Sequence, residues 1–344
     1  MPVWLNNKFL VVTTIAAPNE VLLSLADGAR QNNYTFICIG DRKSPDDFAL
    51  DGIDFYSIDK QSSLDLRFVG QCPENSYSRK NIGYLLAMAQ RAQCIKETDD
   101  DNYPRVPFWD TGRIEVEGTT LSEAKWVNIY SWFAKQHVWP RGFPLEYLHR
   151  PVTPVERPQS ANCVVQQGLA DGNPDVDAIY RLSQPLEAQN HIDFSAREPL
   201  ILNRNSWCPF NSQNTTWWPP AYPLMYLPSY CSFRMTDIWR SFVAQVCLWQ
   251  CDYRVAFFSP TVYQVRNEHD LFDDFKQELP GYLNNAAIID NFEKLNLRSG
   301  EQTIFDNMKK CYGVLVEMGL TEELELSLLE SWKADLLNLG VLED

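Results

Sequence analysis

Positive charge is scarce in this sequence. The 344 residues include 30 Lys and Arg against 45 Asp and Glu, which gives a formal net charge of −15. A surface that binds nucleic acid needs clustered Lys and Arg to meet the phosphates, and no basic stripe is visible along the chain. We therefore expect no nucleic-acid-binding surface.

Long apolar runs are also missing. A membrane-spanning helix needs ~20 consecutive apolar residues, whereas the run at residues 9–17 is short, rich in β-branched residues and preceded by one Lys. This composition favours a buried first strand over the apolar core of a signal peptide. The sequence predicts no transmembrane segment and a cytoplasmic location. The alternative location is the lumen of the secretory pathway, if the chain is an excised catalytic domain.

Paired metal-binding cysteines are absent as well. Nine cysteines occur, an odd number, and none belongs to a CxxC pair. Cys247 and Cys251 lie four residues apart on an expected helix, but no matching pair of His accompanies them, so zinc is not expected. We see no internal repeat and no low-complexity linker, and a hydrophobic content of 45% is that of a globular chain.

What the sequence does contain is an α/β pattern at its start. The apolar run at 9–17, an amphipathic segment at 20–31 and a second apolar run at 35–39 predict a βαβ unit, and a third short strand is expected at 54–58. Because ligands bind at the carboxyl ends of strands in doubly wound sheets, the loop after the second run is a candidate binding loop. In it, Asp41 can accept hydrogen bonds from a ribose or base and Lys43 can meet phosphate. An ordinary turn is the alternative.

Four carboxylates then stand close together in the segment ETDDDN at residues 97–102. Neighbouring carboxylates repel one another unless a cation lies among them, and Mg²⁺ and Mn²⁺ prefer oxygen ligands and often keep a bound phosphate as a further ligand. A metal-bound diphosphate is therefore our leading interpretation, and a solvated acidic turn is the alternative. Arg79 and Lys80, at the start of an expected helix over 82–89, would offset remaining phosphate charge.

These residues carry a resemblance to a known family. The sequence is similar to the STELLO-type proteins and, more distantly, to the reversibly glycosylated polypeptides, both of which resemble nucleotide-sugar glycosyltransferases of the GT-A architecture. The matching stretches are RKNIGYL at 79–85, ETDDDN at 97–102, WPRGFPL at 139–145, QQGLADGNPDVDA at 166–178, PFNSQNTT at 209–216 and FRMTDIWR at 233–240. The resemblance implies an α/β, GT-A-like nucleotide-sugar-binding domain with a mixed, mostly parallel sheet flanked by helices.

The resemblance also implies roles for individual residues near the acidic segment. Asp99 and Asp101 are expected to ligate Mn²⁺ or Mg²⁺ as a DxD pair, with Asp100 directed at the sugar or ribose. The pair Glu97-x-Asp99 is an open alternative. Thr13 and Thr14, after the first strand, together with Asp41 and Lys43, are expected to line the nucleotide pocket. UDP is the nucleotide that the family leads us to expect.

A second set of expectations concerns the acceptor. Removing a proton from an acceptor hydroxyl requires a positioned base, and Asp237 resembles the acidic residue that opens a late GT-A helix, although an Asp at a helix start is also a common capping residue. Trp239 and Arg240 are expected to face sugar or phosphate, with core packing as the alternative for Trp239.

Two further loops complete the set of candidate residues. Asp175 and Asp177 are expected beside the acceptor, where their carboxylates can bind sugar hydroxyls, and a polar surface turn is the alternative. His269 is expected as an additional metal or diphosphate contact, because GT-A enzymes often supply a late His. Structural roles are the alternative for any single His.

The pattern changes after about residue 272. Amphipathic segments at 273–279, 282–295, 301–318 and 321–339 predict helices. We therefore expect a GT-A-like domain over residues 1–271 and a C-terminal helical region over 272–344. That region is expected to pack on the catalytic domain or on another subunit, which would make a homo-oligomer.

Three functions remain open at this point. The first is a metal-dependent glycosyltransferase that moves a sugar from a nucleotide-sugar, expected to be a UDP-sugar, to a hydroxyl of a glycan or other acceptor. The second is a sugar-nucleotide mutase, which needs an Arg that accepts the sugar; Arg150 lies near the corresponding region in a different local sequence. The third is a non-catalytic scaffold for glycan synthesis.

Overall fold

The protein is built around one mixed sheet, seen in a computed structural model that describes residues 7–122, 125–149, 155–185, 191–265 and 270–343. Within those residues the strand order is β3-β2-β1-β4-β9-β7-β6-β8-β10-β5, with an additional pairing of β7 and β10. The strands are β1 (Lys8–Thr13), β2 (Tyr34–Ile39), β3 (Asp54–Tyr56), β4 (Cys94–Thr98), β5 (Asn102–Pro104), β6 (Glu115–Ser122), β7 (Val155–Gly172), β8 (Leu200–Ile201), β9 (Asn214–Trp217) and β10 (Arg254–Gln264).

The first half of the sheet is parallel. Strand β1 pairs in parallel with β2 and β4, and β2 pairs in parallel with β3. The side chains of β1 alternate between two buried faces: Leu10 and Val12 join the core formed with helix α1 (Glu20–Gln31), and Phe9 and Val11 join the core that contains helix α4 (Lys80–Ala89). Burial on both faces explains why the strand is a continuous apolar run, as parallel strands usually are.

Helix α4 lies unusually close to the sheet because of one glycine. A Cβ atom on Gly83 would stand 2.5 Å from Val11 Cγ1, so any larger residue would push the helix away from β1. The close packing fixes Arg79 and Lys80, at the start of α4, beneath the carboxyl ends of β1 and β4. A local sequence choice thus positions two of the predicted site residues.

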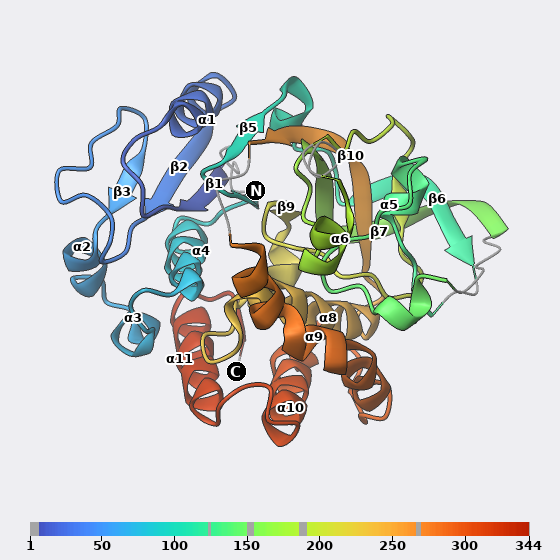
Figure 1. Cartoon of the computed structure of the whole chain (residues 1–344). Helices are drawn as coiled ribbons and strands as arrows, with labels where there is room; N and C mark the ends of the chain where they lie inside the picture. Colours follow the sequence, from blue (N-terminus) through green and yellow to red (C-terminus); the bar gives the residue numbers. More distant parts are fainter. Residues whose placement is uncertain (1–6, 123–124, 150–154, 186–190, 266–269, 344) are drawn as a thin grey trace.

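The second half of the sheet is organised by the long strand β7. Its first part, through Asn162, pairs with β6, and its later part pairs with β9 and β10. Strand β9 in turn pairs antiparallel with β4 and so joins the two halves. In Figure 1 the parallel half carries α1 on one side, and β6, β7 and β10 form the opposite side of the molecule.

Further helices and helical turns lie in the described part of the chain before residue 265. They are α2 (Ile58–Ser62), α3 (Arg67–Gln71), η1 (Tyr77–Arg79), η2 (Val106–Trp109), α5 (Tyr130–Phe133), η3 (Leu145–Tyr147), α6 (Ala178–Ser183), η4 (Pro219–Met225), η5 (Phe233–Met235) and α8 (Thr236–Trp249).

The C-terminal region consists of α9 (Leu271–Phe292), η6 (Glu301–Thr303), α10 (Ile304–Glu317) and α11 (Leu324–Asn338), which lie below the sheet in Figure 1. The sequence predicts two helices at 273–279 and 282–295, but the structure has one, with Pro280 inside it. Although an interior Pro removes a helix hydrogen bond, α9 packs against α6 and η5, and this tertiary packing holds the helix continuous.

These helices share their core with the sheet. Residues of α9, α10 and α11 belong to the same buried apolar cluster as α4 and α8. Buried Asp335 of α11 caps α3, since its carboxylate accepts from the backbone N–H groups of Arg67 (2.9 Å) and Phe68 (2.8 Å). The region therefore packs against the α/β body, one of the two arrangements expected from the sequence.

The predicted α/β class, a mixed sheet flanked by helices and followed by a C-terminal helical region, is confirmed. The division at residue 271 stays a prediction. In the portion of the chain that the structure describes, none of the helices combines the length and apolar character needed to cross a bilayer.

Candidate functional site

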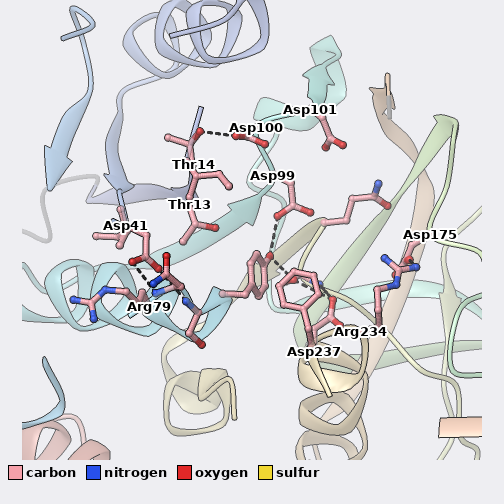
Figure 2. Close-up of a pocket in the computed structure, with 18 of the residues that line it drawn as sticks. Thr13, Thr14, Asp41, Arg79, Asp99, Asp100, Asp101, Asp175, Arg234 and Asp237 are labelled. Carbon is pink, nitrogen blue, oxygen red and sulfur yellow. Dashed lines mark hydrogen bonds and ion pairs between the residues drawn. The ribbon is translucent and has the colours of Figure 1, made fainter. Parts of the chain in front are cut away.

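A cavity of about 500 Å³ opens at the carboxyl ends of β1, β2 and β4, where Thr13, Gly40 and Asp99 lie. Its far wall includes Asp175, Arg234 and Asp237 (Figure 2), and Arg141 and Ser212 also line the cavity. The predicted site residues that line it are Thr13, Thr14, Asp41, Lys43, Arg79, Asp99, Asp100, Asp101, Asp175 and Asp237. The fold thus brings together side chains from most of the length of the chain.

Asp99 is the first of three consecutive carboxylates on the loop after β4. Its Oδ1 atom accepts from Tyr77 Oη (2.8 Å) and from Lys80 Nζ (3.1 Å), and its side chain keeps 30% of its surface exposed. Lys80 itself is fully buried, and its ammonium also donates to the carbonyl of Thr98 (2.8 Å). Lys80 therefore acts on the site through Asp99, and the cavity is lined by Asp99 and not by Lys80.

Asp100 is tied to the end of strand β1. Its Oδ2 atom accepts from Thr14 Oγ1 at 2.5 Å, and its backbone carbonyl accepts from the side chain of Asn19 at 3.0 Å. Burial, and secondarily the charge of Asp99, raises the pKa of Asp100. The Thr14 hydroxyl is therefore already engaged with the acidic loop before any ligand arrives.

Asp101 turns towards strand β10. Its Oδ2 atom accepts from Gln264 Nε2 (2.9 Å), and its Oδ1 atom accepts from Asn102 Nδ2 (3.2 Å). Burial, reinforced by the charge of Asp99, raises the pKa of Asp101 to about 7. Repulsion from Asp99, which the sequence predicts, is the second cause of this rise after burial, and a cation bound at the loop would offset that repulsion.

The three carboxylates diverge towards three different partners. Among the described residues, no group of three His, Cys, Asp or Glu side chains gathers closely enough to hold a metal ion. His269, expected as an additional ligand, lies outside the described residues, as does Arg150. The oxygens of Asp99 and Asp101 fit a divalent ion chemically, and diphosphate oxygens and water can provide further ligands.

Glu97, the other carboxylate of the alternative Glu97-x-Asp99 pair, does not line the cavity. Its carboxylate is fully buried and accepts from Arg240 Nη2 at 2.8 Å, from Trp217 Nε1 at 2.7 Å and from the hydroxyl of Tyr84. Glu97 lies within β4 and points into the core shared with α8, whereas Asp99 lies beyond the end of the strand, where the alternation of side chains no longer applies.

Three predicted substrate contacts are corrected. Arg240 is the buried partner of Glu97, and the indole of Trp239 donates to Asn285 in the core (3.0 Å). Asp177 is the N-cap of α6, accepting from Tyr180 N (2.7 Å) and from the indole of Trp139, and burial raises its pKa to about 7. None of the three lines the cavity, because each satisfies a buried polar group of the scaffold instead.

Asp41 and Arg79, two of the residues expected to bind the nucleotide, line the cavity, and their side chains also hold neighbouring loops in place. The Asp41 carboxylate accepts from the backbone N–H groups of Asn75 (2.9 Å) and Ser76 (3.0 Å). The Arg79 guanidinium donates to Gln61 Oε1 (2.6 and 2.8 Å) and to the carbonyl of Cys72 (3.1 Å). Both residues fix the loop that forms this end of the cavity.

The opposite wall is an acid–arginine network around Asp237. Arg141 donates to both carboxylate oxygens of Asp237 (3.0 and 3.2 Å) and makes a bidentate pair with Asp175 (2.7 and 2.8 Å). Burial acts to raise the pKa of Asp175, but Arg141, Arg234 and a hydrogen bond from Asn211 together outweigh it, and the net shift of the pKa is downward. Asp237 Oδ2 also accepts from the backbone N–H and hydroxyl of Ser212 (both 3.1 Å).

A chain of hydroxyls links this wall to the acidic loop. The Tyr77 hydroxyl lies 2.8 Å from Asp99 Oδ1 and 2.7 Å from Ser212 Oγ, and Ser212 Oγ lies 3.1 Å from Asp237 Oδ2. Asp99 and Asp237 lie at the two ends of this series of hydrogen bonds (Figure 2). Two carboxylates 138 positions apart in the sequence numbering thus share one hydrogen-bonded path.

Sequence reasoning missed several residues that line the cavity, namely Tyr77, Arg141, Ser212, Phe233, Arg234 and Gln264. The signal that could have found most of them is present, because Arg141, Ser212, Phe233 and Arg234 all lie inside the stretches that carry the family resemblance. Tyr77 and Gln264 lie outside those stretches, and only the tertiary structure brings them to the site.

Comparison with known proteins supports the resemblance. Residues 234–342 match the family model of the STELLO glycosyltransferases. The chain is 29% identical to the probable glycosyltransferase STELLO2 of Arabidopsis thaliana and 28% identical to STELLO1 of the same plant, in each case over 97% of this chain and 45% of the relative. The chain therefore spans somewhat less than half the length of these curated relatives.

Solved structures show only distant similarity. A crystal structure of a mycobacterial protein aligns with a TM-score of 0.40 and 12% identity, covering 82% of this chain and 75% of that one. The glucosyl-3-phosphoglycerate synthase of M. tuberculosis aligns with a TM-score of 0.38 and 9% identity, covering 82% and 81%. Similarity at this level carries no conclusion about shared function.

Proposed function

We propose that this chain, which is similar to the STELLO glycosyltransferases, is itself a glycosyltransferase that moves a sugar from a nucleotide-sugar donor to a hydroxyl acceptor. One observation carries the proposal. A single cavity has an acidic loop at the carboxyl ends of parallel strands on one side and a buried, positioned carboxylate, Asp237, on the other. The family that the chain resembles supports the same activity.

The donor is proposed to lie along the ends of β1, β2 and β4. Thr13, Asp41 and Lys43 lie at the end suited to a nucleoside, and UDP is our choice from the family resemblance. Asp99 and Asp101 would hold a Mn²⁺ or Mg²⁺ ion with the diphosphate, and the ion would supply positive charge for the departing diphosphate. The hydrogen bonds of Lys80 and Tyr77 hold Asp99 Oδ1, which leaves the other carboxylate oxygen for this task.

Asp237 is proposed as the base. In the transfer, the bond from the sugar C1 to the diphosphate oxygen breaks, a bond from C1 to the acceptor oxygen forms, and the acceptor proton passes to a carboxylate oxygen. Among the described contacts, Oδ1 of Asp237 accepts only from Arg141, whereas Oδ2 has three hydrogen bonds. Oδ1 is therefore the oxygen with room for that proton. The structure also gives Asp237 a fixed orientation, which a base requires.

Calorimetry with UDP and Mn²⁺ tests this function first. The proposal predicts that UDP binds in the presence of Mn²⁺ and much more weakly with a chelator, and that at least one member of a panel of UDP-sugars is slowly hydrolysed. Absence of binding by the wild-type protein with metal present would favour a scaffold for glycan synthesis. A sugar bound covalently to the protein after incubation with a UDP-sugar would favour the mutase.

A further inference from the structure

Phe233 is an aromatic side chain left largely uncovered inside a polar cavity. It is the first residue of η5, it lines the cavity, and 56% of its surface is exposed. Met235, two residues later in the same turn, is 1% exposed. A single exposed apolar side chain is not informative by itself. This ring, however, lines the wall of a cavity, where a ligand can cover it.

The ring is held in a fixed position. It makes a T-shaped contact with Tyr77, with ring centroids 6.0 Å apart and planes at 81°. Tyr77 is itself fixed by the hydrogen bond of its hydroxyl to Asp99. The following residue, Arg234, donates to Glu278 Oε1 (2.7 and 2.9 Å) and so anchors η5 to α9. A ring fixed in advance loses little conformational freedom when a ligand covers it.

Hydrogen-bonding groups surround this one apolar plate. Arg141, Asp175, Gln213 and Asp237 line the same cavity, and the carboxylates and guanidinium among them are held by one another. A pyranose ring has apolar C–H faces and a rim of hydroxyls, so an aromatic plate within a rim of carboxylates, amides and guanidinium groups matches its chemistry. A lipid chain would make no hydrogen bonds to these polar groups, and a free phosphate would meet repulsion from the carboxylates.

We propose that Phe233 is the stacking platform for a pyranose ring in this cavity. The inference rests on the proposed glycosyl transfer and extends it, because it assigns a saccharide subsite to the wall that carries Asp237. The pyranose can be the donor sugar, which is attached to the nucleoside diphosphate, or the acceptor sugar, which is not. Binding measurements can therefore separate them.

The test compares Phe233→Ala, Phe233→Leu and Phe233→Trp with the wild type. The matched control is Phe272→Ala on α9, which removes a Phe that is 67% exposed and does not line the cavity. Circular dichroism and thermal unfolding establish that each variant is folded. Calorimetry at saturating Mn²⁺ then measures UDP, a panel of UDP-hexoses and UDP-pentoses, and methyl glycosides of the same sugars added to the protein with UDP bound.

The proposal predicts that Phe233→Ala and Phe233→Leu leave the UDP affinity within about twofold and weaken at least one saccharide arm by roughly five- to tenfold, the size of an aromatic stacking contribution. Phe233→Trp and Phe272→Ala should bind like the wild type. Weakening confined to the UDP-sugars places the donor sugar on Phe233, and weakening of the glycosides places the acceptor there.

Other outcomes overturn the inference. These are unchanged saccharide binding in Phe233→Ala, equal weakening of UDP and the sugars, full retention of affinity in Phe233→Leu, and a wild-type protein that binds UDP but gains nothing from any sugar of the panel. A wild-type protein that does not bind UDP at all is a distinct result, because it contradicts the glycosyltransferase function itself.

Discussion

Replacing Arg240 with Met is expected to destabilise the protein strongly without changing its cavity. The substitution keeps an apolar stem of similar length and removes the guanidinium that donates to both oxygens of Glu97 (2.8 and 3.1 Å). Arg240 is 1% exposed and Glu97 is fully buried, so the remaining carboxylate cannot recover its hydration. Neither residue lines the cavity.

The magnitude follows from what remains around Glu97. Breaking a buried ion pair by removing one partner typically costs about 3–5 kcal/mol. Trp217 Nε1 and the Tyr84 hydroxyl still donate to the carboxylate, which places the expected loss at the lower end, about 3 kcal/mol. In the double variant Glu97→Gln/Arg240→Met both charges are gone, and most of the lost stability should return.

Urea unfolding followed by tryptophan fluorescence measures both values, and calorimetry with UDP and Mn²⁺ on the folded variants measures the site. We expect ligand affinity within about twofold of the wild type in both variants, because the pair supports the core between β4 and α8. A stability loss of Arg240→Met below about 1 kcal/mol, the range of an exposed pair, would refute the reasoning. Loss of metal-dependent UDP binding in the folded double variant would instead indicate that Glu97 is a metal ligand.

Three further predictions address the base, the loop and the scaffold. Asp237→Asn should keep UDP affinity within about twofold and lower turnover at least roughly a hundredfold, as loss of a general base does; unchanged turnover would exclude Asp237 as base. Tyr77→Phe removes a hydrogen bond to Asp99 and should weaken Mn²⁺-dependent UDP binding by about 1 kcal/mol, or roughly fivefold; calorimetry showing equal affinity would mean that this bond does not position Asp99. Asp335→Ala removes the cap of α3 and should lower the free energy of unfolding by about 1–2 kcal/mol, with UDP binding unchanged. Loss of UDP binding without loss of stability would contradict a purely structural role for Asp335.

The parts of the site that the sequence predicted are those set by local pattern. Apolar runs mark β1 and β2 as parallel strands, and the rule that ligands bind at their carboxyl ends points to the loop with Asp41. The acidic loop was found from its clustered carboxylates, and Thr14 from the family resemblance. The cavity lies at that edge of the sheet and is lined by these residues. Local sequence pattern was sufficient to predict these residues, because each lies close to the end of a strand in the sequence.

The remaining features depend on direction and on distant partners. Periodicity alone could not show that Glu97 points into the core while Asp99 points into the cavity, because that depends on where Arg240 lies, 143 positions later. The pairing of Arg141 with Asp175 is likewise a tertiary contact between loops. Pro280 misled the helix prediction because packing outweighed the missing hydrogen bond.

The most direct test of the central claim is Mn²⁺-dependent UDP binding by the double variant Asp99→Ala/Asp101→Ala. Its matched control is Asp46→Ala/Asp47→Ala, which removes two charges from exposed residues that do not line the cavity. We predict that calorimetry finds no difference in UDP affinity with and without Mn²⁺ for the double variant, while the control binds like the wild type. Undiminished metal-dependent binding by the Asp99→Ala/Asp101→Ala protein would contradict the account.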